Sequence, residues 1–215
     1  MKNFAIILAG CGVYDGAEIH EAVMTIYAVI KNGAGYQLFA PDIAQHHVVN
    51  HLTGTEMPEK RNVLVESARI ARGNIKPLTD LDMRDFDALI FPGGFGVAKN
   101  LCSFAFKGAD CEVHPQVIKV VRDAVSLRKP VGALCISPVI LAKVLGDVTV
   151  TVGPDEGDAA NVNAMGARHI ATKHGDVIVD EKHKLFSTPC YQLESTIVQI
   201  AEGTDNIVKK MLKVM

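Results

Sequence analysis

The sequence predicts an α/β fold in which helices cover both faces of a doubly wound, mostly parallel sheet. Short, continuous apolar runs are typical of parallel strands that are buried on both faces. Between them lie longer stretches in which apolar residues recur at helical spacing. This strand, helix, strand order implies right-handed crossovers and places ligand sites at the carboxyl ends of the strands. We expect one domain over residues 1–215, because that length suits a single α/β domain.

The first half of the chain opens with a βαβ pattern and ends in a buried strand. In order, we expect a strand at 4–9, a glycine-rich loop at 10–16, a helix at 17–32, a strand at 36–40, a polar, irregular loop at 43–62, a helix at 63–72 and a strand at 87–91. Pro-Gly-Gly-Phe-Gly at 92–96 follows that last strand directly.

The second half repeats the alternation and closes with a hairpin and helices. In order, we expect an amphipathic helix at 114–128, a strand at 130–134, a helix at 137–145, a strand at 148–152, a loop at 153–167, a hairpin from strands at 176–179 and 184–187, a helix at 193–200 and one more helix to the end.

Charge and cysteine usage exclude several classes of protein. The formal net charge of −2 gives no electrostatic reason to expect nucleic acid as a partner. No apolar run approaches the ~18 residues of a membrane span, so we expect no membrane association. The five cysteines are odd in number and lack paired metal-finger spacing. Without an export signal they indicate reduced thiols and a cytoplasmic location.

Cys135 stands directly between a predicted strand and a predicted helix, with no loop residues to spare. Such a sharp turn resembles the nucleophile elbow and tolerates only small neighbours, here Ala133 and Ser137. The following helix would aim its N-terminal dipole at the sulfur and lower the pKa of the thiol. A small buried cysteine with a packing role only is the alternative.

The glycine turn at 92–96 ends a strand at the same edge of the sheet. Consecutive glycines allow backbone N–H groups to point into a site, and Gly93 is expected to border it. The N–H groups of Gly94 and Ile136 would together form an oxyanion hole beside Cys135. A tight turn that needs a positive φ would explain the glycines equally well.

Glu18 and Glu21 open the first helix three residues apart, so they share one face. Either carboxyl could point over the strand ends toward Cys135 and act as a general acid and base. Acidic residues in a first turn also suit the helix dipole, which is the plain explanation.

Other polar side chains receive less weight. Cys11 ends the first strand and could lie near Cys135, while Lys99 and Asn100 follow the glycine turn and could line the pocket. The spacing of His47 and His51 suits a metal, but no acidic or cysteine partner lies near them in sequence, so we expect no metal site. We expect three late histidines to lie on the surface or in the core rather than beside Cys135: His169, His174 and His183.

Several strings together resemble the PfpI superfamily, which includes the Parkinson's-associated deglycase and is related to class I glutamine amidotransferases. These are D-A-L-I-F-P-G-G at 87–94, the cysteine elbow after K-P at 129–130, and E-x-x-E at the start of the first helix. More specific strings are similar to the ElbB branch, described as glyoxalase-like and associated with isoprenoid biosynthesis: G-C-G-V-Y-D-G at 10–16, H-L-T-G at 51–54, R-N-V-L at 61–64 and G-F-G-V-A-K-N-L at 94–101.

This resemblance covers nearly the whole chain and implies a flavodoxin-like three-layer sandwich and a homodimer. It implies that Cys135 is the nucleophile and that Glu21 is its hydrogen-bonding partner. One departure matters: many relatives carry a histidine directly after the cysteine, where this chain has Ile136. The amidotransferases take their histidine from a later segment, and Thr188 occupies the nearest counterpart here.

A missing Cys-His pair disfavours glutamine hydrolysis and peptidase activity, because both need a base for the nucleophile and an acid for the leaving amine. We therefore expect a glyoxalase III-type enzyme that converts small 2-oxoaldehydes to hydroxy acids without a cofactor. The alternative is a redox-responsive or accessory binding protein with an oxidisable cysteine and weak aldehyde activity.

Overall fold

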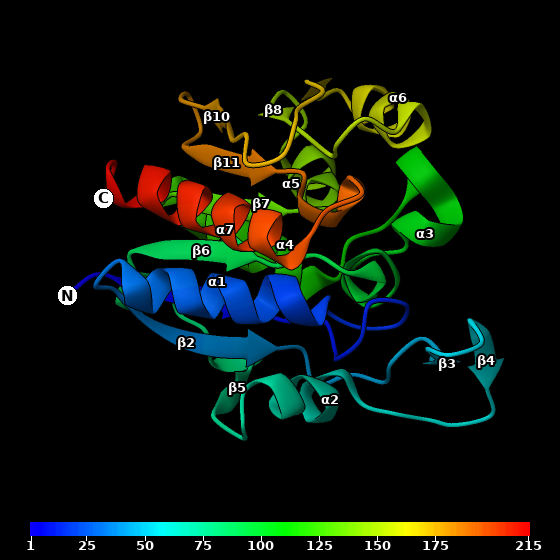
Figure 1. Cartoon of the computed structure of the whole chain (residues 1–215). Helices are drawn as coiled ribbons and strands as arrows, with labels where there is room; N and C mark the ends of the chain where they lie inside the picture. Colours follow the sequence, from blue (N-terminus) through cyan, green and yellow to red (C-terminus); the bar gives the residue numbers. More distant parts are fainter.

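A seven-stranded sheet forms the centre of the protein in the computed structural model, which describes residues 1–215 (Figure 1). The strand order is β10-β11-β7-β6-β1-β2-β5, and every neighbouring pair is parallel except β10 with β11. The strands are β1 (Asn3–Ile7), β2 (Gly35–Ala40), β5 (Ile75–Pro77), β6 (Ala88–Phe91), β7 (Val131–Leu134), β10 (Ile178–Asp180) and β11 (Leu185–Thr188). The predicted doubly wound, mostly parallel α/β fold is confirmed.

Helices cover both faces of this sheet. On one face α1 (Ile19–Lys31) and α7 (Ile197–Leu212) pack against each other, and α4 (Pro115–Ser126) and α5 (Pro138–Leu145) lie on the other face (Figure 1). The helix α2 (Val63–Ile70) lies beside β2 and β5. All side chains of β6 and β7 are buried, which explains why their sequences are continuous apolar runs.

Gly132 shows why the middle of β7 has no side chain. A Cβ at this position would lie 2.7 Å from the sulfur of Met211 on α7 and 2.9 Å from a side-chain carbon of Ile90 on β6. Glycine therefore lets α7 pack close to the central strands.

The segment 43–62, predicted to be an irregular loop, contains a small hairpin. Its strands are β3 (Val48–Asn50) and β4 (Thr55–Met57), joined through Gly54, whose φ is +71°. These strands are three residues long and only Val48 among their residues is buried, so they show no apolar alternation that would have revealed them.

Residues 153–167, also predicted to be a loop, contain the helix α6 (Glu156–Ala164). Asp155 caps its first turn by accepting from the Asp158 N–H, and Val162 is its only buried residue. A helix with one buried residue has no apolar stripe, so its sequence shows no apolar residues at helical spacing. The predicted strand at 148–152 shortens to β8 (Thr149–Val150), which pairs with β9 (Arg168–His169) outside the main sheet.

The C-terminal region differs from the two predicted helices. Residues 193–196 precede a single helix, α7, whose first turn is closed by a reciprocal capping box between Thr196 and Gln199. Gly203 does not interrupt this helix. A Cβ there would lie 3.4 Å from the Thr188 hydroxyl and 3.8 Å from the Cys190 sulfur, so the residue sits where the helix passes closely over β11.

Residues 97–110 form a series of short turns between β6 and α4. A π-helical turn at Val97–Leu101 is followed by α3 (Phe104–Lys107) and a 3₁₀ turn at Gly108–Asp110. Both chain termini lie at the end of the sheet opposite to the carboxyl ends of its parallel strands (Figure 1). No helix of the structure has both the length and the apolar content that crossing a membrane requires.

Candidate active site

Cys135 occupies a strained turn at the carboxyl end of β7, as the sequence predicted. Its φ is +58°, a left-handed conformation that non-glycine residues rarely adopt. Its N–H donates to the Thr188 carbonyl at 2.9 Å, which ties the turn to the end of β11. The Ser137 hydroxyl donates to the Pro92 carbonyl at 2.7 Å, which ties it to the glycine turn after β6. Two neighbouring strand ends therefore hold the elbow.

Glu21 is the carboxyl that lies beside Cys135: its Oε2 and the Cys135 sulfur flank the same point next to Gly93, and each group shifts the pKa of the other. The Glu21 side chain is fully buried, with its Oε2 accepting from the Gly93 N–H at 2.9 Å and its Oε1 accepting from the Tyr191 N–H at 3.2 Å. Three strand ends thus converge on this carboxyl group.

Glu18, the other predicted carboxyl, has a different position. Its side chain caps α1 by accepting from the Glu21 N–H at 2.7 Å, and it borders the cavity above the thiol. The first glutamate of the E-x-x-E pattern therefore fixes the helix end from which the second one projects.

Gly93 lies against both reacting groups. A Cβ at this position would lie 2.4 Å from the Cys135 Cβ, 2.5 Å from the Glu21 Oε2 and 2.9 Å from the Cys135 sulfur. The absence of a side chain here is what allows the carboxyl and the thiol to meet. Gly94 has a φ of +102° and leaves room for the backbone of residues 16–18.

The N–H groups of Gly94 and Ile136 both donate toward the Cys135 sulfur, as predicted from the strand ends. Each of them lowers the pKa of the thiol, because each favours the thiolate. Their common direction gives a pocket in which a negative charge on sulfur, or on an oxygen bound next to it, meets two fixed dipoles.

The prediction that the thiol is acidified is wrong. Burial raises the pKa of Cys135 well above its ordinary value, the charge of Glu21 raises it further, and the two N–H groups only oppose this. Burial and the charge of Glu18 likewise raise the pKa of Glu21 to about 8, against a lowering by the N–H groups of Tyr191 and Gly93. The prediction considers only the effect of the helix dipole on the pKa of the thiol, whereas removal of the sulfur from water has the larger and opposite effect. At neutral pH the pair therefore holds a proton on the carboxyl.

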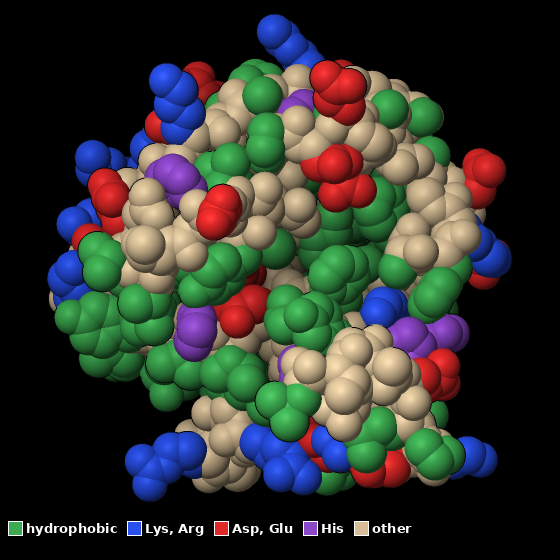
Figure 2. All heavy atoms as spheres, turned by 45° about the vertical axis from the view of Figure 1, so that its right-hand side comes forward, with side chains coloured by type: hydrophobic (Ala, Val, Ile, Leu, Met, Phe, Trp, Pro, Cys, Tyr) green, Lys and Arg blue, Asp and Glu red, His purple; other side chains and the backbone are tan.

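A cavity of about 640 Å³ opens above the thiol. Hydrophobic side chains border a hollow near the middle of the face shown in Figure 2. The cavity is lined by the glycine turn and the elbow, by α3 and α6, and by residues after β11. The lining residues used below are Phe95, Lys99, Phe104, Phe106, Asp158 and Tyr191, together with Glu18, His47 and Cys135.

Lys99 lines this cavity, but Asn100 and Cys11 do not. The buried Asn100 amide donates to the carbonyls of Ala9 and Asp15, each at 2.9 Å, and its oxygen accepts from the His46 N–H. It therefore connects the loop after β1 to the segment 43–62 and has no free group for a ligand. Burial, and next the charge of Glu66 on α2, raise the pKa of the Cys11 thiol.

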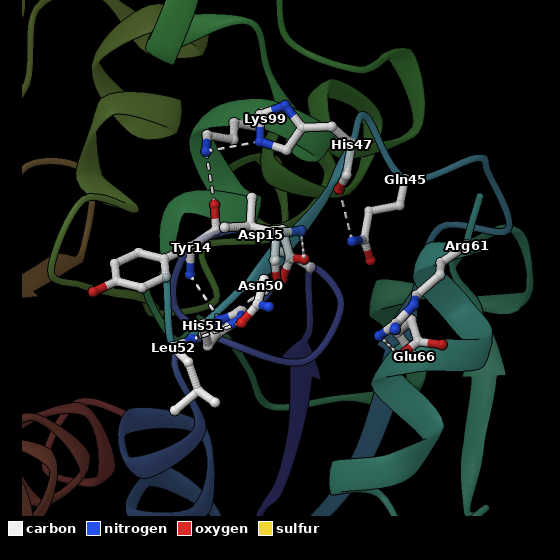
Figure 3. Close-up of polar contacts among 12 residues, drawn as sticks. Tyr14, Asp15, Gln45, His47, Asn50, His51, Leu52, Arg61, Glu66 and Lys99 are labelled. Atoms are coloured by element: carbon white, nitrogen blue, oxygen red, sulfur yellow. Dashed lines mark hydrogen bonds and ion pairs between the residues drawn. The ribbon is translucent and has the colours of Figure 1, made fainter. Parts of the chain in front are cut away.

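The segment 43–62 borders the cavity through His47 (Figure 3). The His47 Nε2 lies 3.1 Å from the Lys99 Nζ, and burial, followed by the charge of Lys99, lowers the pKa of the imidazole. Figure 3 also shows His51, whose Nε2 accepts from the Tyr14 N–H and lies 3.9 Å from the buried Asp15 carboxylate. These contacts fix the segment on the loop that follows β1.

None of the late histidines lines the cavity above the thiol. His174 contacts Ser195 and His183 contacts Asp180, while His169 belongs to β9. Thr188, which stands where the amidotransferases place a histidine, donates its hydroxyl to the Asp176 carbonyl. No cluster of three or more histidine, cysteine or carboxylate side chains is arranged for a metal ion.

Several site residues were missed from the sequence. Cys190 is buried at a left-handed φ of +46°; burial raises the pKa of its thiol well above the ordinary value, and the charges of Glu21 and Cys135 raise it further. Tyr191 contributes its backbone N–H to Glu21. Both residues follow β11 at the carboxyl edge of the sheet, so the strand-end argument applied to the other segments would have found them.

Comparison with known proteins gave close relatives, although no protein-family model matches the chain. The chain is 45% identical over 219 residues to the human "glutamine amidotransferase-like class 1 domain-containing protein 3, mitochondrial", covering 97% of this chain and 82% of the relative. It is 36% identical over 230 residues to the zebrafish (Danio rerio) "ES1 protein, mitochondrial", covering 98% and 85%.

Solved structures give the same result for the fold. A crystal structure of an isoprenoid biosynthesis protein with an amidotransferase-like domain from Ehrlichia chaffeensis superposes with a TM-score of 0.93 at 34% identity, covering 100% of this chain and 99% of that one. The Drosophila melanogaster protein DJ-1beta superposes with a TM-score of 0.58 at 16% identity, covering 99% and 95%, which shows a shared fold.

Proposed function

The chain belongs to the glutamine amidotransferase-like class 1 family of the PfpI superfamily, and from this membership and the site geometry we propose a glyoxalase III-type enzyme. It would convert 2-oxoaldehydes to hydroxy acids without a cofactor. The observation that carries the proposal is the adjacent pair of Cys135 and Glu21, in which a buried carboxyl with a pKa of about 8 lies beside the only thiol that lines the cavity. Such a pKa suits a group that both gives and accepts protons near neutral pH.

The reaction balances with these groups alone. The Cys135 sulfur attacks an aldehyde carbon, the thiol proton passes to the ionised form of Glu21, and Glu21 returns it to the carbonyl oxygen to complete a hemithioacetal. Glu21 then takes the proton from that carbon and gives it to the neighbouring carbonyl oxygen, which forms an enediol. It next removes the hydroxyl proton of the first carbon and delivers a proton to the second carbon, which leaves a thioester of a hydroxy acid. Water cleaves the thioester, and the sulfur recovers its proton. The N–H groups of Gly94 and Ile136 stabilise the oxygen that becomes negative in the addition and cleavage steps.

Amide hydrolysis is less well supported by the same geometry. It requires an acid that protonates a leaving amine, commonly a histidine paired with the cysteine. Ile136 follows the nucleophile here, and the cavity histidine, His47, is hydrogen-bonded to Lys99. An isomerisation that only relocates protons on a bound carbonyl compound needs no such group.

The test is turnover of methylglyoxal to lactate, followed by NMR, with the wild-type protein and three variants. We expect Cys135→Ala to abolish lactate formation and Glu21→Gln to reduce it by at least ~100-fold, the loss typical of removing a general acid and base. Cys11→Ala removes a thiol outside the cavity and should retain wild-type turnover. Lactate formation by Cys135→Ala at the wild-type rate would refute the proposal.

A redox-responsive protein is the second candidate, and the protonated Glu21 favours it. Two equivalents of peroxide would oxidise the Cys135 thiol through a sulfenic to a sulfinic acid, with reduction of the peroxide to water. The carboxyl proton would then hydrogen-bond a sulfinate oxygen. Intact mass after peroxide treatment distinguishes the two functions: rapid addition of two oxygens at Cys135, combined with no methylglyoxal turnover, would favour the sensor.

The homodimer that the resemblance implies stays a prediction. Val23, Tyr27 and Ile30 project from one side of α1 and are between 42% and 56% exposed, so they offer an apolar surface that a second copy would cover. Sedimentation equilibrium tests this, and a monomer at micromolar concentration would contradict it.

A further inference from the structure

The cavity above Cys135 is larger than a simple dialdehyde requires. Its volume of about 640 Å³ corresponds to roughly twenty water molecules at ~30 Å³ each. Glyoxal has four non-hydrogen atoms and would fill a small part of this space. Cavities of ~300–1,000 Å³ are those that enclose whole drug-sized ligands. The volume therefore indicates a ligand with a body beyond its reacting carbonyl group.

Three phenylalanine rings belong to the lining of the cavity. Phe95, Phe104 and Phe106 all line it, and Phe95 and Phe106 remain 48% and 52% exposed. The ring of Phe106 packs on the ring of His46, with centroids 4.3 Å apart, so contact with the segment 43–62 holds it in place. Exposed aromatic surface that is held in position and faces a cavity suits a flat, apolar ligand group.

Lys99 is the only lysine or arginine that lines this cavity. Its ammonium group donates to the Tyr14 carbonyl at 2.7 Å and contacts the His47 Nε2 at 3.1 Å (Figure 3). No carboxylate lies within ion-pair distance of it, and it lies 5.2 Å from the centroid of the Phe95 ring. An ammonium group has three N–H donors, so one remains for a ligand.

The acidic side chains of the cavity lie on other elements. Glu18 accepts from the first turn of α1, and Asp158 belongs to α6, whereas Lys99 lies beside the segment 43–62. Burial lowers the pKa of the Lys99 ammonium group, and the charges of Asp15 and Glu56, which do not line the cavity, oppose this. Within the cavity an anionic ligand group is therefore favoured beside Lys99 rather than beside Glu18 or Asp158. The lysine is adjacent to one of the three rings, because Lys99 lies over the Phe95 ring.

We propose that this pocket binds an aromatic carbonyl compound that carries a carboxylate. The carboxylate pairs with Lys99, the ring rests on Phe95, Phe104 and Phe106, and the carbonyl group faces Cys135. The position of the carbonyl group rests on the function proposed above, whereas the recognition of the ring and the carboxylate does not. Lys99 is thus a specificity-determining residue, and small dialdehydes lack the groups that it and the phenylalanines recognise.

Binding of two unreactive probes tests this without any turnover. Isothermal titration calorimetry would compare 3-phenylpropionate with its neutral amide, 3-phenylpropionamide, on the wild-type protein. We expect the acid to bind about tenfold or more tightly, the discrimination expected of one hydrogen bond between charged groups. Acetate, which lacks the ring, should bind far more weakly than 3-phenylpropionate. Bound 3-phenylpropionate should also slow the alkylation of Cys135 by iodoacetamide, which places it in this cavity.

Lys99→Met is the decisive variant. Lys60→Met, which changes an exposed lysine outside the cavity, is the matched control. We expect Lys99→Met to bind the acid and the amide equally and to keep the wild-type affinity for the amide, which shows that the pocket is intact. Lys60→Met should retain the preference for the acid. If Lys99→Met does not fold, a loss of the wild-type preference for the acid on raising the salt concentration carries the same information.

Three results would overturn the inference: equal affinity of the wild-type protein for acid and amide, a preference for the acid that survives in Lys99→Met, or no binding of the acid at millimolar concentrations. Failure of the proposed function is separate from these. A protein that selects 3-phenylpropionate but turns over no 2-oxoaldehyde would refute the glyoxalase proposal and leave the binding inference standing. One that produces lactate yet binds both probes equally would do the reverse.

Discussion

Replacing Glu21 with glutamine is expected to remove a pH dependence of stability that this buried carboxyl imposes on the wild-type protein. The pKa of Glu21 rises from an ordinary 4.5 to about 8 in the folded state, chiefly because the carboxyl is buried. Between these two values the folded protein holds a proton that the unfolded chain has released. The free energy of unfolding therefore falls as the pH rises through this interval and becomes level above the folded pKa.

The magnitude follows from the linkage relation. One proton of difference lowers the free energy of unfolding by about 1.4 kcal/mol per pH unit, so the group contributes a loss of roughly 2–3 kcal/mol between pH 5.5 and 7.5. Glutamine does not titrate, so Glu21→Gln should lack this contribution. The amide of the introduced glutamine would also face the N–H groups of Gly93 and Tyr191. This contact changes the stability of the variant by an amount that does not depend on pH.

Urea unfolding followed by circular dichroism at pH 5.5, 6.5 and 7.5 measures the difference between the two proteins at each pH. We expect the stability of the wild type relative to Glu21→Gln to decline steadily across the series. Cys135→Ala should decline as the wild type does, because burial is the main cause of the raised pKa and the neighbouring thiol opposes it. Parallel curves for the wild type and Glu21→Gln would refute the raised pKa and with it the acid and base role.

Other substitutions test the packing around the pair. Gly93→Ala would place a Cβ 2.4 Å from the Cys135 Cβ, so we expect a loss of about 1–3 kcal/mol of stability and about a hundredfold lower turnover. Gly157→Ala, where the nearest atom would lie 3.1 Å from the new Cβ, should keep wild-type stability and turnover. Asn100→Ala breaks three hydrogen bonds and should lower the free energy of urea unfolding by about 2–4 kcal/mol; a change below measurement error would contradict its connecting role. Glu18→Ala removes the cap of α1 and should cost about 1 kcal/mol, which Glu18→Asp should partly restore.

The parts that the sequence predicted well share a clear physical signature. Strands such as β6 and β7 are buried on both faces and read as unbroken apolar runs. The elbow was visible because a cysteine with small neighbours joined a strand directly to a helix, and its φ of +58° confirms the strain. The choice of Glu21 over Glu18 depended on the family resemblance, since helical spacing alone places both carboxyls on one face.

The parts that the sequence did not predict depend on tertiary contacts. The helix α6 buries a single residue, and so do the short strands β3 and β4 together, so no apolar pattern marks them. The direction of the Cys135 pKa depends on burial, which outweighs the two N–H donors and cannot be read from neighbouring letters. The connecting role of Asn100 was also hidden, because its hydrogen-bond partners are distant in sequence. Ala9 lies 91 positions away and His46 lies 54 positions away.

The placement of the two termini has a practical consequence for studying this molecule. Both ends lie at the edge of the sheet from which the parallel strands start, and Cys135 lies where they finish (Figure 1). A linker attached at either end would orient an immobilised molecule with its pocket toward the flowing solution. Surface-based binding sensors and resin-bound preparations could therefore sample small ligands without the support blocking entry.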